Sequence, residues 1–256
     1  MLHDDVRTLT AKDLPPHDII LGSPPCQDLS AANPRAAGID GARSNLFFEA
    51  VRLVGESRPV WGCFENVPAS RTRGIDRVLA ALEALDYACW PLVVGADCAG
   101  APHIRERLWL VFADAASAGQ RSGPADAGSR QERLSMDRSQ SRRHAEHLDE
   151  STRPDWQAGL PDLAQLDDGP AAELARNGAL YRAICAAQGD AIVPQVAYQI
   201  IRAMSAMFPD ARRVLDLFSG AVGGWTYACT WAGLDVVTAC EIDPWRREVY
   251  AAVHHG

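Results

Sequence analysis

The sequence predicts a doubly wound α/β fold with a mostly parallel sheet. Short apolar segments that end in turn residues alternate with amphipathic segments along the chain. Such alternation is typical of a parallel sheet that carries helices on both faces. The 256 residues, 47% of them hydrophobic, are enough for one sizeable core. We therefore expect a single α/β domain to account for most of the chain.

The pattern of apolar residues places the individual elements. Strands are predicted at residues 17–23, 60–67, 87–97, 107–114, 212–220 and 234–243. Helices are predicted where apolar residues recur at spacings of three and four, at residues 43–57, 74–86, 194–208 and 244–255. A glycine-rich turn after the fifth strand leads into a further helix. Ligands of such sheets collect at the carboxyl ends of the strands, so polar residues there are the candidates for a site.

Composition narrows the class of protein. No apolar run approaches the roughly 18 to 20 residues of a membrane span, and the opening residues MLHDDVRTLT lack a secretory signal, so a cytoplasmic location is the default expectation. The seven cysteines form no CxxC pair, which argues against a disulfide framework and against a metal site. The net charge of −8 argues against non-specific coating of nucleic acid, although local basic clusters can still bind phosphates.

One polar segment interrupts the alternation. Residues 115–154 are rich in Ser, Arg, Gly, Asp and Gln and contain few large apolar residues. The segment is interpreted either as a linker or as a basic loop around Arg138, Arg142 and Arg143 that meets DNA phosphates.

The stretch GSPPCQDLS, which follows the first predicted strand, presents a cysteine in an unusual setting. Pro24 and Pro25 fix the backbone and give a rigid turn that sets the direction of Cys26. If a helical turn follows, its backbone N–H groups favour a thiolate at Cys26. A packing role remains the alternative for a cysteine at the end of a strand.

Two further motifs supply partners for a reactive cysteine. Glu65 ends the apolar strand of the FENV motif, where a carboxyl near the core can have a raised pKa and act as a proton donor. Arg105 and Arg107 stand two residues apart in PHIRERLWLVF and are expected to point to the same side. Taken singly, these residues would also fit an exposed glutamate and surface salt bridges.

GSPPCQDLS, FENV and PHIRERLWLVF, in this order, resemble the motifs of the DNA cytosine-5 methyltransferase family. The resemblance implies that Cys26 attacks carbon 6 of a flipped-out cytosine, that Glu65 engages nitrogen 3, and that Arg107, supported by Arg105, binds the carbonyl oxygen of the base. It implies a Rossmann-like fold of the S-adenosylmethionine-dependent type and double-stranded DNA as the substrate. RNA stays open as another substrate.

The stretch from residue 212 to residue 250 has the layout of a nucleotide-binding unit, with a strand, a glycine-rich turn, a helix and a second strand that ends in an acid. Its DLFSG and EIDPW motifs resemble the S-adenosylmethionine motifs of the same family. The resemblance implies cofactor contacts from Phe218, Ser219, Gly220, Gly223, Glu241 and Ile242. FSGAVGG carries one residue more before its paired glycines than the common family form, so which glycine meets the methionine end stays open.

The order of these motifs differs from the usual order of the family, in which the cofactor segment precedes the cysteine. The sequence is therefore interpreted as circularly permuted, which puts Asp5 at the position of the adenine-binding Asp and predicts that Met1 and Gly256 lie within reach of a short loop. QGDAIVPQ resembles the last family motif, with Asp190 in place of Asn.

Three regions follow from this interpretation. Residues 1–113 form the catalytic half, residues 114–179 an insertion with a reduced recognition region, and residues 180–256 the cofactor-binding half. The expected activity is methylation of carbon 5 of cytosine in DNA, as in phage or restriction-modification enzymes. The alternative is a catalytically impaired subunit that binds cofactor or DNA and depends on a recognition partner. The target sequence and the oligomeric state cannot be inferred from the chain.

Overall fold

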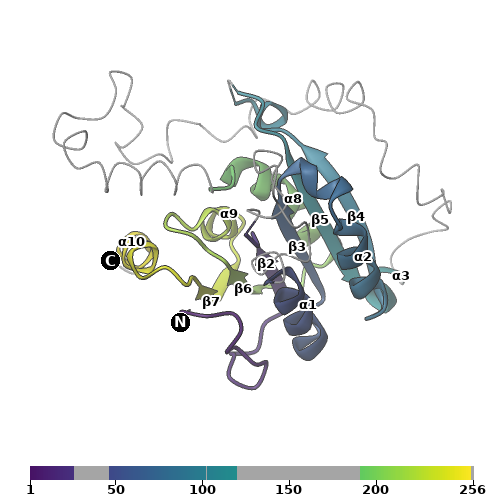
Figure 1. Ribbon diagram of the computed structural model, residues 1–256, viewed down its shortest axis with the longest axis horizontal. Coiled ribbons are helices and arrows are strands. Elements are labelled where there is room, and N and C mark those ends of the chain that lie inside the picture. The colour runs from purple at the N-terminus through teal and green to yellow at the C-terminus, as the bar shows by residue number, and fades with distance from the viewer. Residues whose placement is uncertain (26–45, 102, 120–190, 255–256) are drawn as a thin grey trace.

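A seven-stranded sheet with helices on both faces organises the computed structural model (Figure 1), which describes residues 1–25, 46–101, 103–119 and 191–254. The strands are β1 (Leu2–His3), β2 (Ile19–Gly22), β3 (Trp61–Asn66), β4 (Tyr87–Val94), β5 (Arg107–Asp114), β6 (Arg213–Leu217) and β7 (Asp235–Cys240). The helices are α1 (Leu46–Ser57), α2 (Ile75–Glu83), α3 (Ala115–Gly119), α8 (Pro194–Met207), α9 (Gly224–Trp231) and α10 (Pro244–His254), with short 3-10 turns η2 (Pro68–Thr72) and η3 (Ala96–Ala99). Within these ranges, no helix is long and apolar enough to cross a membrane.

The sheet has the order β1-β7-β6-β2-β3-β5-β4 and is mostly parallel, which confirms the predicted fold class. The first five strands of this order are parallel to one another, whereas β5 runs antiparallel to both β3 and β4. The reversal at β5 has a local cause. Only η3 lies between β4 and β5, without the longer crossover helix that a parallel return requires.

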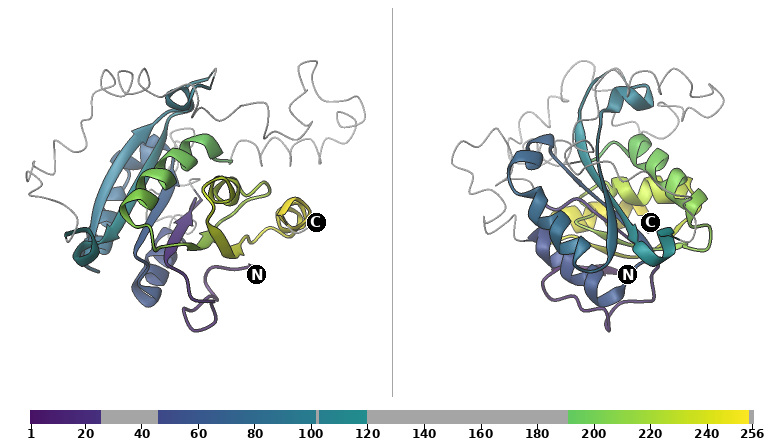
Figure 2. Two further views of the ribbon diagram at one scale, coloured as in Figure 1. Left: turned by 180° about the vertical axis from the view of Figure 1, so that it is seen from behind. Right: turned by 90° about the vertical axis from the view of Figure 1, so that its right-hand side faces the viewer.

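Alternating side chains of the strands fill two separate cores. In β2, Ile20 contributes to the core that contains α1 and α2, whereas Ile19 and Leu21 contribute to the core that contains α8 and α9. All three are fully buried. Because successive strand residues point to opposite faces, a strand buried on both faces is a continuous apolar run, as IILG is here. Figure 2 shows these helix pairs on opposite faces of the sheet.

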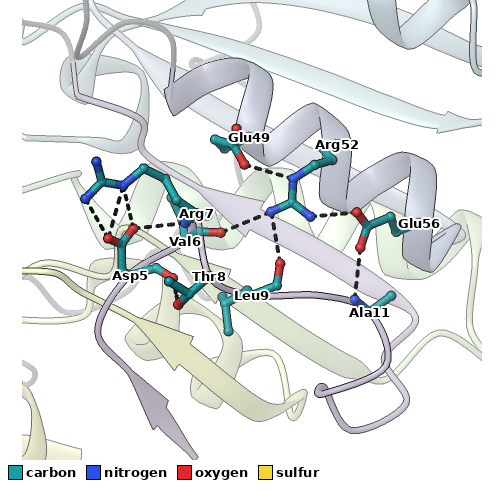
Figure 3. Close-up of polar contacts among 9 residues, drawn as sticks. All are labelled: Asp5, Val6, Arg7, Thr8, Leu9, Ala11, Glu49, Arg52 and Glu56. Atoms are coloured by element: carbon teal, nitrogen blue, oxygen red, sulfur yellow. Dashed lines mark hydrogen bonds and ion pairs between the residues drawn. The ribbon is translucent and has the colours of Figure 1, made fainter.

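The connection from β1 to β2 is held against α1 by one arginine (Figure 3). The guanidinium of Arg52 donates to the carbonyl oxygens of Val6 (3.2 Å) and Leu9 (2.9 Å) and pairs with Glu56 on its own helix (2.6 Å). Glu56 in turn accepts from the backbone N–H of Ala11 (3.1 Å). These contacts fix a loop that has no regular structure, so the segment after β1 takes a defined path along α1.

The first and last elements of the described chain are both linked to β7, one by pairing and one by sequence. β1 pairs in parallel with β7, and the N-terminal amine of Met1 donates to the carbonyl of Val237 (3.1 Å). α10 follows β7, and Nε2 of its last residue, His254, lies 2.9 Å from the carbonyl oxygen of Val222 in the glycine loop. Gly256, which the permutation hypothesis places near Met1, lies outside the described residues. β1 itself was not expected from the sequence, because two residues carry too little pattern.

A buried polar group connects β6, α9 and α10. Asp216 on β6 is completely buried and accepts a hydrogen bond from the hydroxyl of Thr226 on α9 (2.8 Å). The Thr226 oxygen lies 2.7 Å from the hydroxyl of Tyr250 on α10. Burial raises the pKa of Asp216 to about 7, with a further contribution from the negative charge of Glu241. The second carboxyl oxygen of Asp216 has no hydrogen-bond partner among the described residues, so ionisation of this group is costly in the folded state.

Replacement of Asp216 by Asn is expected to flatten the pH dependence of stability. The folded-state pKa of about 7 lies above the ordinary value of 3.8, so the stabilisation from the protonated group is complete below about pH 4. It is lost as the pH rises through 7. In Asp216→Asn the side chain cannot ionise, so this loss in the free energy of unfolding, on the order of a few kcal/mol, does not occur. The variant should have a higher melting temperature than the native protein at pH 8 but not at pH 4.

The exposed Asp210 provides the control for this change. Asp210→Asn leaves the buried carboxyl in place and should keep the pH slope of the native protein. Melting curves from pH 4 to 8 measure the effect. Equal slopes for Asp216→Asn and the native protein would show that Asp216 titrates normally in the fold.

Candidate active site

β2 and β6, after which two of the predicted motifs begin, lie side by side in the middle of the sheet. β6 and β2 are parallel neighbours, with Gly22 at the end of β2 opposite Leu217 at the end of β6. On one side of this pair, β6 is followed in the sheet by β7 and β1. On the other side, β2 is followed by β3. The chain thus builds the sheet outward in opposite directions from β6 and from β2. Doubly wound sheets bind their ligands in the crevice at such a switch point. GSPPC begins at one of these two strand ends and FSG at the other.

Glu65 and Arg107 form an ion pair across β3 and β5. Nε of Arg107 lies 3.0 Å from Oε1 of Glu65. Because β5 is antiparallel to β3, the first residue of β5 lies at the edge where β3 ends. The antiparallel pairing is therefore what brings the FENV carboxyl and the second arginine of IRER together. Glu65 is 6% exposed, so this pair lies largely out of water.

The environment of Glu65 makes its carboxyl a group that can both hold and release a proton near neutral pH. Burial raises the pKa of Glu65 to about 7, although the positive charge of Arg107 acts in the opposite direction. A hydrogen bond from the side chain of Ser23 and the charge of Arg105 also lower it. A carboxyl with a pKa close to neutral is suited to general acid catalysis. The sequence-based expectation of a raised pKa at this strand end agrees with this direction.

Arg105 acts on Glu65 from a different position than the sequence suggested. β5 begins at Arg107, so Arg105 lies in the turn before the strand, with a positive φ of 28°. Strand alternation therefore does not determine its direction, and the argument that both arginines share one strand face does not apply. Its guanidinium donates to the carbonyl oxygen of Ala191, just before α8. Arg105 thus connects the β5 side of the site to the C-terminal segment.

The turn that carries the proline pair is attached to the end of β3. Nδ2 of the buried Asn66 donates to the carbonyl oxygen of Pro24 (3.0 Å). Ser23 accepts a hydrogen bond from Nε1 of Trp225 on α9 (3.1 Å). Sequence reasoning assigned no role to Ser23 or Asn66, although each belongs to a quoted motif. Cys26 itself lies outside the described residues, as does Asp190.

The glycine loop after β6 combines an open glycine with a packed one. Phe218 and Gly220 both have positive φ, at 58° and 68°, and a Cβ added to Gly220 would meet nothing within 4 Å. A Cβ at Gly223 would lie 2.6 Å from the ring of Tyr250 and 2.5 Å from His254. Glycine at 223 is therefore required by α10, whereas Gly220 leaves backbone accessible. Positive φ at a non-glycine residue such as Phe218 is a strain that tends to occur at functional sites.

The acid at the end of β7 faces this loop. Glu241 is 7% exposed, and its carboxylate accepts from the backbone N–H of Gly220 and of Asp243, each at 2.9 Å. The next residue, Ile242, is 59% exposed. Ser219, the loop residue before Gly220, is tied to the carbonyl of Cys240 through its backbone N–H (2.9 Å). The loop after β6 and the end of β7 thus form one connected surface, as expected for a nucleoside site.

Asp5 lies just beyond β1, at the same edge, but its carboxylate is already paired. Arg7 binds both oxygens of Asp5 through Nε (2.9 Å) and Nη2 (2.6 Å), and its backbone N–H adds a third hydrogen bond (2.9 Å). The hydrogen bonds from Arg7 lower the pKa of Asp5. Any further donor to Asp5 therefore has to share these oxygens with Arg7.

Together these side chains form two neighbouring groups at one edge of the sheet. The first contains Glu65, Arg105 and Arg107, which can bind and protonate a planar polar base. The second contains Gly220 and Glu241, which offer an open backbone and a carboxylate to a nucleoside. Where the structure describes the chain, no group of three or more His, Cys, Asp or Glu side chains is arranged to hold a metal ion.

Part of this chain is similar to known DNA methylases. Residues 1–150 match the model of the C-5 cytosine-specific DNA methylase family. Type II methyltransferase M1.ScrFI of Lactococcus lactis subsp. cremoris is 38% identical over 116 residues, which cover 44% of this chain and 30% of that protein. Type II methyltransferase M.DsaV of Dactylococcopsis salina is 32% identical over 111 residues, covering 42% and 31% of the two chains.

The similarity to these relatives covers only part of each chain. The chain spans about a third of the length of these curated relatives. Among solved structures, the Dnmt2 methyltransferase of S. pombe is 21% identical, with a TM-score of 0.36 over 48% of this chain and 42% of that chain. The order and direction of the strands in the sheet therefore define the fold. The family match covers more than half of the chain, and the chain belongs to the C-5 cytosine-specific DNA methylase family.

Proposed function

We propose that the protein transfers a methyl group from S-adenosylmethionine to carbon 5 of cytosine in DNA, through a covalent bond to Cys26. The observation that carries this proposal is the buried Glu65 carboxyl, held by Arg107 at 3.0 Å, at the strand edge that the GSPPC turn also reaches. Membership of the C-5 cytosine-specific DNA methylase family supports the substrate and the reaction class. Type II methyltransferases are among the curated relatives that resemble this chain.

The chemistry requires a nucleophile and an acid on opposite sides of one ring. Carbon 5 of cytosine is a poor nucleophile, and addition of the Cys26 thiolate to carbon 6 moves the electrons of the 5,6 double bond toward nitrogen 3, where Glu65 supplies a proton. Carbon 5 then carries enamine-like electron density and bonds to the methyl carbon of S-adenosylmethionine, while the bond from that carbon to sulfur breaks and leaves S-adenosylhomocysteine. Transfer of the carbon 5 proton to a water molecule restores the 5,6 double bond and expels the Cys26 thiolate, and the nitrogen 3 proton returns to the Glu65 carboxylate.

The two arginines and the protein interior assist these steps. Arg107 holds one oxygen of Glu65 and is placed to donate to the carbonyl oxygen of the base, with Arg105 in support. The cytosine has to leave the DNA stack first, at a cost of a few kcal/mol. Both guanidinium groups are charged donors, which form strong hydrogen bonds to carbonyl and carboxylate oxygens. They therefore stabilise the polar edge of the cytosine ring once the base has left the stack.

The second group of residues fits S-adenosylmethionine, which supplies a methyl group on a positively charged sulfur. The open backbone at Gly220 lets the methionine end approach, and the Glu241 carboxylate accepts ribose hydroxyls beside Ile242. Gly220 is the better candidate than Gly223 for this approach, because Gly223 packs against α10. Phe218 and Ser219 shape the loop. Asp5 and Asp190 are proposed to contact S-adenosylmethionine because of their positions in the sequence relative to the family motifs.

We also propose that the family order is permuted in this chain. Counted from β6 to the end of the chain and then on from β1, the sheet order becomes 3-2-1-4-5-7-6. The first five numbers of that order are those of the doubly wound fold. The parallel pairing of β1 with β7 supports this, because α10 would then be the crossover between them. Residues 1–113 and 180–256 are proposed as two halves of one domain, with a reduced recognition region at 114–179.

Cys26→Ser is expected to abolish methyl transfer to mixed-sequence double-stranded DNA. DNA that carries 5-fluorocytosine should form a covalent complex with the native protein that survives denaturation, because fluorine cannot leave carbon 5 as a proton does. Cys26→Ser should form none, and Cys98→Ser, at a partly buried cysteine outside the site, should form it normally. Cofactor binding without transfer by the native protein would favour the alternative of an impaired binding subunit, and transfer only to RNA would replace the substrate.

Glu65→Gln is expected to lower the rate of transfer by about 10²- to 10⁴-fold, the usual contribution of a general acid. Because the protonated carboxyl is the active form, kcat/KM of the native protein should fall as the pH rises through about 7. The variant should lose this dependence on pH. A pH–rate profile of both proteins measures it, and the same falling limb in Glu65→Gln would assign the limb to another group.

The permuted order predicts that the usual order also folds. A rearranged chain with residues 180–256 ahead of residues 1–179 should melt cooperatively and bind S-adenosylmethionine within a few-fold of the native affinity, since compact domains commonly tolerate the rejoining of their termini. A second rearranged chain, cut between Gly62 and Cys63 inside β3, is the control and should not fold. Failure of the first rearranged chain to fold or to bind S-adenosylmethionine would contradict the permutation.

A further inference from the structure

Arg52 on α1 binds two segments of the chain with one guanidinium (Figure 3). On its own helix it pairs through Nε with Glu49 (2.8 Å) and through Nη1 with Glu56 (2.6 Å), three residues before it and four residues after it. Its Nη2 donates to the carbonyl oxygens of Val6 (3.2 Å) and Leu9 (2.9 Å). The guanidinium is planar and its N–H groups have fixed directions. The two carboxylates therefore set the plane in which Arg52 holds the segment after β1.

The turn that Arg52 holds also carries Asp5. The carbonyl oxygen of Asp5 accepts from the backbone N–H of Thr8 (3.1 Å), and the carbonyl oxygen of Val6 accepts from the backbone N–H of Leu9 (3.4 Å). The segment after β1 is thus a compact turn with its own hydrogen bonds. Because Val6 follows Asp5 directly, a contact that fixes the Val6 carbonyl also fixes the backbone that carries the Asp5 side chain.

The strand register places Asp5 near the acid at the end of β7. His3, the last residue of β1, lies opposite Cys240, and its carbonyl oxygen accepts from the backbone N–H of Glu241 (3.0 Å). Asp5 follows His3 by two residues, and Glu241 follows Cys240 directly. Within the described residues the pairing of β1 ends at His3, so the path of the turn decides how far the Asp5 carboxylate lies from Glu241.

The Asp5 carboxylate is oriented by Arg7 and can accept one more hydrogen bond. Arg7 reaches its oxygens with three N–H groups, which are the backbone N–H (2.9 Å), Nε (2.9 Å) and Nη2 (2.6 Å). An ionised carboxylate offers about four lone-pair positions. One position thus remains for a ligand, and the amino group of a purine base is a donor that fits it.

We propose that Arg52 is a positioning residue for the adenine end of the cofactor. From α1 it fixes the turn after β1, and so the place of the Asp5 carboxylate relative to Glu241. The proposal rests on the proposed function, in which Glu241 accepts the ribose hydroxyls and Asp5 contacts S-adenosylmethionine. Arg52 acts only through the carbonyl oxygens of Val6 and Leu9 and binds no part of the cofactor itself.

The test compares the affinities of two ligands by isothermal titration calorimetry. S-adenosylhomocysteine and its analogue with purine in place of adenine differ only in the amino group. The native protein should bind S-adenosylhomocysteine about 10- to 100-fold more tightly, the effect of one hydrogen bond to a charged group. In Arg52→Gln this ratio should fall below about 3-fold, because the Asp5 carboxylate is no longer held at the amino group. Lower stability alone weakens the binding of both ligands equally, so the ratio reports the position of Asp5 and not the folded fraction.

Two further variants at these positions sharpen the test. Arg52→Lys keeps the charge but not the planar fork, so it should lower the ratio nearly as far as Arg52→Gln. It also serves as the test variant if Arg52→Gln does not fold. Asp5→Ala should lower the ratio to the same level, and the double variant with Arg52→Gln should lower it no further, because both changes remove the same contact.

Arg58, the residue after α1, provides a matched control. Like Arg52, it binds one backbone carbonyl and one carboxylate, in this case those of Leu85 and Asp114 (3.2 Å to the carboxylate). Its partners lie before β4 and at the end of β5, on strands that do not adjoin β1 or β7. Arg58→Gln should lower the melting temperature and leave the ratio of the two affinities at the native value.

Each outcome decides the role of Arg52. A fall of the ratio in the Arg52 variants and not in Arg58→Gln supports the proposal. A native ratio in the folded Arg52 variants overturns it, as does an equal fall in Arg58→Gln, or a native protein that binds neither ligand or does not distinguish them. No DNA is present in the measurement. A protein that binds S-adenosylhomocysteine but transfers no methyl group therefore fails the proposed function, while the ratio still decides the role of Arg52.

Discussion

The site depends on one constraint of topology: the carboxyl ends of β6 and β2 are neighbours in the sheet, although the two strands are far apart in the sequence. Gly22 pairs with Leu217, and the two cores on either face hold both strands in register. Because every parallel strand ends at the same edge, the residues that follow β1, β2, β3, β6 and β7 converge there. The acidic, glycine-rich and proline-rich motifs gain a common location only through this pairing.

The protonation of the two buried carboxyl groups, Glu65 and Asp216, depends on their burial and on the hydrogen-bond donors and charges around them. Glu65 and Asp216 are both buried and both have a pKa raised to about 7, but their surroundings differ. Glu65 has the guanidinium of Arg107 3.0 Å away, whereas Asp216, within the part of the chain that the structure describes, has one neutral hydroxyl donor and one oxygen without a hydrogen-bond partner. The first arrangement allows proton exchange at the end of a strand. The second fixes a neutral acid between β6, α9 and α10.

Much of the fold could be predicted from the sequence, because strands such as IILG and helices such as the one at 194–207 carry clear apolar periodicity. The reversal of β5 and the existence of β1 could not, since both depend on pairing between distant segments. The sequence also pointed to Glu65 and Arg107, which the structure pairs. It missed Ser23 and Asn66, whose roles come from hydrogen bonds to other elements and not from residue type. Cys26 and Asp190 keep their assignments as predictions.

The central claim is that the cysteine motif and the glycine loop serve one active site at the β6–β2 switch point. A crystal structure of the protein with S-adenosylhomocysteine and DNA that contains 5-fluorocytosine tests it most directly. The account predicts the amino-acid end of the cofactor at Gly220, its ribose at Glu241, and a flipped cytosine bonded to Cys26 with its nitrogen 3 within hydrogen-bonding distance of Glu65. A cofactor bound away from the β6 and β7 ends, or a base that does not reach Glu65, would contradict it.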